Sequence, residues 1–100
     1  MVQVQRNGSA SPTTSSSELL TARIGAQKRT QLIIINTHAT SVVTIAKGET
    51  AAVAGAGIVL QPKQAYVEST DGGYECWQGA VQIIADAGAT VAYSEGMVVQ

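Results

Sequence analysis

The sequence lacks most of the groups from which active sites are built. It contains one histidine (His38), one cysteine (Cys76) and no phenylalanine, and only 13% of its 100 residues are charged. A single cysteine excludes an intrachain disulfide and a cysteine-rich zinc site. A Cys76 nucleophile would need a base, and His38 is the only imidazole available, so we interpret Cys76 as a small, partly buried side chain. These absences favour a structural or binding module, and we predict no catalytic residues.

Charge and long apolar runs are also scarce. The net charge is −1, and the six Lys and Arg residues are scattered, so no basic stripe is present to neutralise the phosphates of a nucleic acid. The longest purely aliphatic run, residues 32–35, is far shorter than the roughly 20 residues of a membrane-spanning helix. The start of the chain has no apolar core of signal-peptide length. We therefore expect synthesis in the cytoplasm, where a free thiol is stable, and neither a nucleic-acid nor a membrane partner.

No motif for a cofactor or metal is visible. A phosphate-binding loop is absent, and the stretch Gly55-Ala56-Gly57 lacks the rest of a dinucleotide fingerprint. His38 lies in a predicted polar turn, and the carboxylates are dispersed along the chain. We expect no metal, no cofactor and no small-molecule substrate.

What the sequence does contain is a series of short segments rich in Val, Ile and Thr. They span residues 19–24, 29–36, 42–46, 58–60, 64–68, 77–85 and 90–95, with an apolar tail at 97–99. Alanines at 49–56 allow a helix there, but Gly55 and Gly57 disfavour it. Short strands separated by turn signals every 8–12 residues or so are typical of an all-β fold. We predict a single-domain antiparallel β-sandwich or jelly-roll-like barrel.

The strand expected at residues 29–36 is apolar on both faces. Leu32 and Ile34 face one side, and Ile33 and Ile35 face the other. Such a strand is either buried on both faces or meets another chain. Because few aromatics are available, a small aliphatic core also favours oligomerisation. We predict Ile33, Ile35 and Trp77 as candidates for a trimer interface.

The first 17 residues differ in composition from the rest. They are rich in Ser and Thr and offer little to bury, so they are predicted to be an extended N-terminal arm, followed by a sandwich domain at residues 18–100. Val2 and Val4 alternate with glutamines, which suits a short added strand. We expect the arm to contact a shell or a neighbouring subunit through Val2, Val4, Arg6 and Pro12.

The order of features in residues 29–95, about two thirds of the chain, resembles small all-β virion proteins of tailed bacteriophages that decorate the capsid or form head fibres. The motifs that carry the resemblance are Arg29-x-x-Leu32-x-Ile34-x-Asn36, Val43-x-Ile45 with Gly48, Gly57-Ile58-x-Leu60-x-Pro62, Trp77-Gln78-Gly79-Ala80-Val81, and Val91-Ala92-Tyr93-Ser94-Glu95. In that family the third motif often ends in Pro-Gly. Here Lys63 follows Pro62, so we expect a different turn.

The resemblance implies a homotrimeric capsid decoration (cement) protein on the outer surface of the virion, with the major capsid protein as its partner. The residues leave a second interpretation open, an adhesive or glycan-binding module of a virion fibre. Trp77 and Tyr74 would be its candidate sugar-stacking residues. A small hydrolase is a third interpretation, and it would require His38 to meet an acid and a nucleophile that the sequence does not group.

Overall fold

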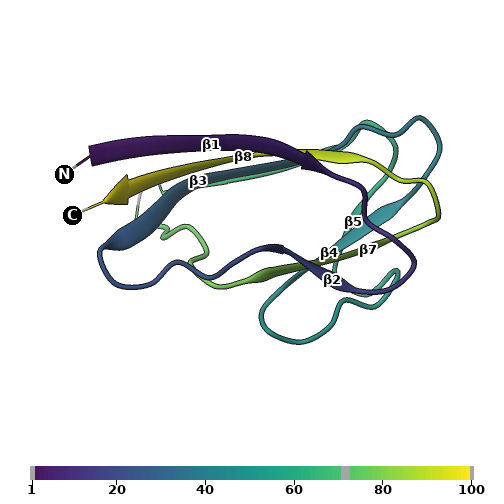
Figure 1. Ribbon diagram of the computed structural model, residues 1–100, viewed down its shortest axis with the longest axis horizontal. Helices are drawn as coiled ribbons and strands as arrows, with labels where there is room; N and C mark the ends of the chain where they lie inside the picture. Colours follow the sequence, from purple (N-terminus) through teal and green to yellow (C-terminus); the bar gives the residue numbers. More distant parts are fainter. Residues whose placement is uncertain (1, 71–72, 100) are drawn as a thin grey trace.

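The computed structural model describes residues 2–70 and 73–99, and these residues form eight strands in two antiparallel sheets (Figure 1). The strands are β1 (Val2–Ala10), β2 (Ser17–Leu20), β3 (Gln27–Asn36), β4 (Val43–Lys47), β5 (Ile58–Leu60), β6 (Ala65–Ser69), β7 (Val81–Ala85) and β8 (Val91–Val99). The prediction of an all-β sandwich is confirmed.

The strand order identifies the sandwich as a jelly roll. Sheet A has the order β1-β8-β3-β6, and sheet B has the order β2-β7-β4-β5. The chain crosses between the sheets at most of its connections, so neighbours within each sheet come from distant parts of the sequence. Eight antiparallel strands in two sheets connected in this way form the double Greek key of a jelly roll. The sequence pattern alone does not distinguish a jelly roll from another sandwich.

The core lies between the inner faces of the two sheets. Leu32 and Ile34 of β3 are fully buried, whereas Ile33 is half-buried and Ile35 is exposed. Other members of the core cluster come from both sheets and include Val43, Ile45, Leu60, Val81, Ile83 and Val91. Side chains of a strand alternate between its two faces. Strand β3 therefore places Leu32 and Ile34 inside the sandwich and leaves Ile33 and Ile35 outside. Strand β3 is therefore not buried on both faces within this chain.

Residues 2–10 belong to the sandwich. Strand β1 pairs with β8 without a break, from Val2 opposite Val99 to Ala10 opposite Val91. Gly8 leaves room for Tyr93 at this position, because a Cβ there would force the Tyr93 ring to shift. Backbone pairing holds the segment without requiring large apolar side chains. The sandwich therefore begins at β1 rather than at residue 18, and the predicted arm is in its first part an edge strand of sheet A.

Several predicted boundaries are wrong. Residues 77–80 form an approach to β7 rather than part of the strand, and the apolar tail at 97–99 continues β8. The alanine-rich stretch at 49–56 contains no helix, and Val53 and Ala56 form an isolated bridge. Small residues there give no apolar stripe on which a helix could pack.

In the described part of the chain, no helix is long and apolar enough to cross a membrane.

The turn between β5 and β6 has a backbone conformation that favours glycine. Lys63 has φ +69°, and the Gln64 N–H donates to Gln61 O at 3.0 Å. Proline at the second position and a positive φ at the third are the features of a type II turn. The Lys63 Nζ donates to the Thr37 carbonyl at 2.7 Å, which holds this lysine in place. Lys63 thus departs from the Pro-Gly pattern of the family, but the backbone of this turn has the type II shape that a Pro-Gly turn would adopt, not a different one.

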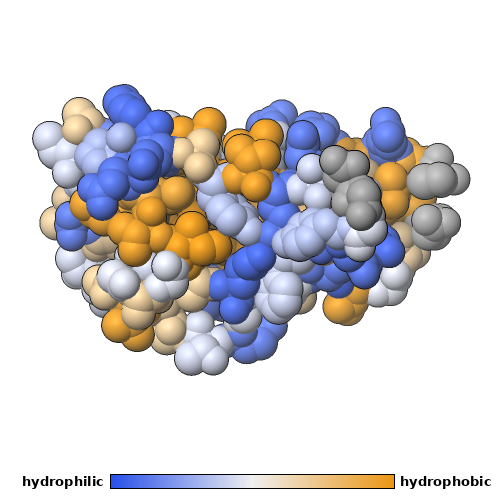
Figure 2. Space-filling model, turned by 180° about the vertical axis from the view of Figure 1, so that it is seen from behind, coloured by the Kyte–Doolittle hydropathy of each residue, from blue (hydrophilic) through white to orange (hydrophobic). Residues whose placement is uncertain are grey.

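The two ends of the described chain lie side by side at one end of the molecule (Figure 1). Strands β1, β3 and β8 are 9, 10 and 9 residues long, while the strands of sheet B have at most 5. Seen from behind, apolar residues gather mainly over the half of the molecule away from these ends (Figure 2).

Candidate functional site

The outer face of sheet A carries no charged residue over three consecutive rows. The pairings of β1, β8, β3 and β6 place the same-face residues opposite one another. The rows are Gln5, Gly96, Gln31 and Ser69; Asn7, Ser94, Ile33 and Val67; and Ser9, Ala92, Ile35 and Ala65. Contact surfaces between proteins are depleted of charge at their centres, whereas an ordinary wet surface is not. We call this surface the uncharged face.

One end of the uncharged face is apolar. Ile33 lies opposite Val67, and Ile35 lies opposite Ala65. Val67 is 62% exposed and Ile35 is 36% exposed. We call Ile33, Ile35 and Val67 the apolar patch. Aliphatic side chains grouped on a water-facing sheet gain free energy when a partner covers them.

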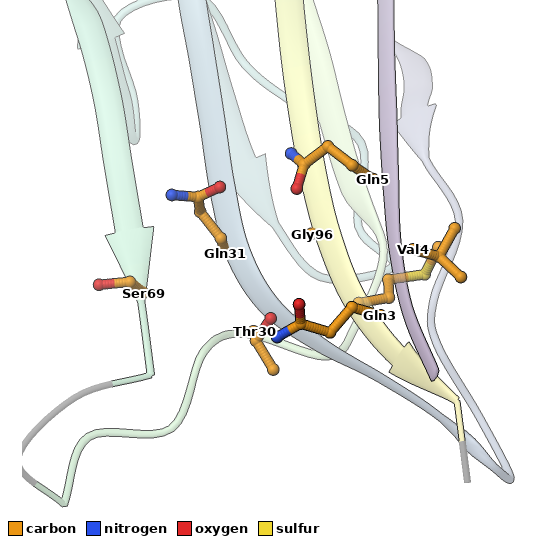
Figure 3. A pocket seen from close by; sticks show the side chains of 8 residues that line it. Gln3, Val4, Gln5, Thr30, Gln31, Ser69 and Gly96 are labelled. Carbon is orange, nitrogen blue, oxygen red and sulfur yellow. The ribbon is translucent and has the colours of Figure 1, made fainter. Parts of the chain in front are cut away.

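The other end of the uncharged face is hollowed into a polar groove of about 510 Å³ (Figure 3). Its lining consists of Gln3, Gln5, Thr30, Gln31, Ser69 and Gly96, with Val4 and Met97. The register of β3 against β8 shifts between Arg29 and Gln31, which marks a β-bulge at Thr30. The hollow forms where this bulge lies beside Gly96, which contributes no side chain.

Trp77 does not lie on the uncharged face. Its indole packs against the chain's own core, and its Nε1–H donates to the Ala80 carbonyl at 2.9 Å. Gly79 lies against the ring, and the Lys47 ammonium lies 5.8 Å from the ring centroid. The structure therefore brings Ile33 and Ile35 together and leaves Trp77 apart from them. Contacts within the chain also occupy the ring that a stacked sugar would need. Tyr74, the other sugar-stacking candidate, is half exposed.

The predicted arm residues are separated into two groups. Val2, Val4 and Arg6 are exposed on β1, all on the side of the strand that faces sheet B. Pro12 is buried within the chain, and the neighbouring Thr13 carbonyl accepts a hydrogen bond from Ala85 N–H at 2.9 Å. Because this contact ties the segment to the end of β7, Pro12 cannot serve as an arm residue that touches a neighbour.

A buried ion cluster closes the sandwich near the chain ends. Glu95 accepts hydrogen bonds from Arg29 Nε at 2.6 Å and from Arg23 Nε at 3.0 Å. Burial alone would raise the pKa of Glu95, but the two guanidinium groups hold it below its ordinary value. Arg29 also donates to the carbonyls of Thr21, Trp77 and Gly79, so it ties the segments beyond β2 and before β7 to sheet A.

A second buried cluster centres on Glu68. Its carboxylate accepts hydrogen bonds from Lys47 Nζ at 2.7 Å, from the Tyr66 hydroxyl and from the Trp77 backbone N–H. Burial would raise the pKa of Glu68, but these donors lower it to about 2. Burial, together with the Glu68 charge, raises the pKa of the Cys76 thiol to about 11. Cys76 is therefore a protonated core residue, more deeply buried than the partly buried side chain that the sequence predicted.

The charged groups of the two clusters are paired with one another inside the fold. Within residues 2–70 and 73–99, every buried side-chain nitrogen and oxygen has a hydrogen-bond partner, and no three His, Cys, Asp or Glu side chains are grouped as metal ligands would be. His38 accepts at Nδ1 from the Thr40 and Ser41 amides, at 3.1 and 3.0 Å, and so serves its own turn. Sequence reasoning missed both clusters. The sequence signal that could have revealed them is a charged residue at a position whose side chain faces inward. Glu95, for example, falls on the same face of β8 as Val91 and Tyr93.

No protein-family model matches this chain, and no curated protein matches it. A solved structure from work on Bacillus endospore appendages, which form a family of disulfide-linked pili, is similar with a TM-score of 0.60 and 12% identity. The match covers 99% of this chain and 88% of the other. The coat protein of Tobacco streak virus has a TM-score of 0.47 and 12% identity over 95% of this chain and 85% of its own. The first of these similarities shows a shared fold.

Proposed function

We propose that this chain is a non-enzymatic structural protein of a virion, a decoration (cement) protein that binds the outer surface of a phage head as a homotrimer. The observation that carries the proposal is the uncharged face with its apolar patch. The resemblance of residues 29–95 to phage decoration and head-fibre proteins supports the same role. The solved structure that shares the fold comes from work on Bacillus pili, which are also assemblies.

The apolar patch forms the contact between copies of the chain. Fully burying one Ile or Val side chain contributes about 1.5–3 kcal/mol. Three such side chains from each protomer, surrounded by small uncharged neighbours, suit a modest but specific trimer contact. Trp77 has no part in this contact, because it packs into its own core.

Strand β1 contacts the major capsid protein. It is an edge strand of sheet A, nine residues long, without proline or lysine and without a bulge in its pairing with β8. Such an edge offers backbone groups to an added strand, and Val2 and Val4 offer exposed apolar side chains. A protein that binds only the assembled shell shifts the equilibrium toward that shell, and three linked copies add avidity.

The assembly is non-covalent. The chain has one cysteine, and Cys76 is buried with its thiol protonated. A disulfide between surfaces, of the kind that the Bacillus pili are described as having, cannot form from this position without opening the core. Cohesion must come from the apolar patch and from strand pairing.

The test measures how much the protein raises the temperature at which undecorated phage heads open. Removing residues 2–17 is a poor test, because it would delete β1 and expose β8. We expect Val2→Asp with Val4→Asp to abolish the stabilisation of heads while leaving the trimer intact. Ile24→Asp is the matched control, since Ile24 is 79% exposed and lies outside β1 and the uncharged face. Full stabilisation by the double variant would contradict the role of β1.

A further inference from the structure

The polar groove on sheet A is distinct from the apolar patch and borders on β1, which contributes Gln3, Val4 and Gln5 to its lining. It lies at the row of Gln5, Gly96 and Gln31, one row beyond Ile33 on the same face. Its volume of about 510 Å³ falls within the range of small-molecule sites, about 300–1,000 Å³. It therefore needs an explanation of its own.

Two side-chain oxygens converge on the floor of the groove. A carbon placed where Gly96 lacks its side chain would lie 3.1 Å from Gln5 Oε1 and 3.7 Å from Gln31 Oε1. Figure 3 shows Gln5 and Gln31 on either side of Gly96. Gln5 is held in this position because its Nε2 donates to Ser94 Oγ at 2.6 Å. A hydroxyl that enters the hollow would thus meet two acceptors at once.

The remaining polar groups of the groove are of the same kind. Gln3 adds a third amide, and Thr30 and Ser69 add hydroxyls. No ionisable side chain is among the lining residues, so a charged ligand would find no opposite charge. Amides and hydroxyls both donate and accept, which matches neighbouring hydroxyls on a sugar ring.

We propose that this groove binds a neutral saccharide through its ring hydroxyls. The site differs from an aromatic sugar platform, because the partly buried Trp77 packs against the chain's own core and the groove contains no aromatic ring. Single contacts of this kind are weak, and several copies on one particle would reach useful strength through avidity.

The experiment uses an array of neutral oligosaccharides ending in galactose or N-acetylglucosamine, with sialylated counterparts as the acidic set. We expect the wild-type protein to bind members of the neutral set and to bind their sialylated counterparts at least tenfold more weakly. The best neutral saccharide is then titrated into 15N-labelled protein. We expect its shifts to concentrate on the side-chain amides of Gln3, Gln5 and Gln31.

Two variants test the groove, with one control. Gly96→Ala places a methyl group on the floor, and Gln31→Ala removes one acceptor if the first variant does not fold. Each should weaken binding at least tenfold. Asn7→Ala alters the same face of sheet A, on β1 and outside the lining, and it should bind like the wild type.

Absence of binding to every neutral saccharide would overturn the proposal. A preference for the acidic set, shifts centred on Tyr74 or Trp77, or full binding by a folded groove variant would do the same. None of these results would touch the trimer or head stabilisation, which are measured separately.

Discussion

Arg29 and Glu95 form a fully buried ion pair, with Nε and Oε2 2.6 Å apart and neither side chain exposed to solvent. The pair joins β3 to β8 across sheet A, and Arg23 adds a second guanidinium to the same carboxylate. Breaking a buried pair leaves an uncompensated charge in the interior. The stability of the chain-end half of the sandwich therefore depends on this carboxylate.

Replacing Glu95 tests that dependence. We expect Glu95→Gln to lower the free energy of unfolding by about 3 kcal/mol or more, because two buried guanidinium groups then lack their counter-charge. Urea unfolding followed by Trp77 fluorescence measures the change. Glu75→Gln is the control, since Glu75 pairs with Lys28 in solvent and should cost about 1 kcal/mol or less. Equal effects of the two variants would contradict the structural role of Glu95.

The pKa of Glu68 gives the fold a defined response to acid. Because its folded-state pKa is lowered from 4.5 to about 2, the ionised carboxylate stabilises the fold above pH 4.5, and this contribution is lost as the pH falls toward 2. We expect the unfolding midpoint of the wild type to fall over this interval. Glu68→Gln should begin less stable at neutral pH and lose less on acidification. An identical acid profile in the two proteins would exclude this contribution of Glu68.

Cys76 should be unreactive in the folded protein. Its side chain is buried, and burial with the nearby Glu68 charge raises the thiol pKa to about 11, so little thiolate exists near neutral pH. We expect Ellman's reagent at pH 8 to modify the thiol only after urea is added. The denatured chain is the control for a competent thiol. Rapid modification of the native protein would show that Cys76 is accessible.

The all-β class could be predicted from the sequence because strand alternation and turn residues are local signals. This alternation correctly placed Leu32, Ile34 and Val81 on inward faces of their strands. The fate of residues 2–10 could not be predicted, because their composition offers little to bury and they are held by backbone pairing to β8, about ninety residues away in the chain. The alternation of Val2 and Val4 with glutamines predicted an added strand, but no local signal identifies β8 of the same chain as its partner.

The candidate site was only partly accessible from sequence. The two-faced pattern of residues 32–35 correctly separated Ile33 and Ile35 from the inward pair. The charge-free rows became visible only when the register placed β1, β8, β3 and β6 side by side. Trp77 was predicted as a core or intersubunit anchor because it adjoins a strong strand. The structure packs it, partly buried, against the chain's own core, on the approach to β7 rather than within the strand.

The most direct test of the central claim, that the uncharged face is an assembly surface, is the native mass by light scattering at neutral pH. We expect the wild type to have a mass near three times 10.3 kDa and Ile33→Glu to have the mass of a folded monomer, because a carboxylate would be buried in the apolar patch. Ile24→Glu, outside the face, should remain trimeric. A monomeric wild type, or a trimer that Ile33→Glu leaves intact, would contradict the claim.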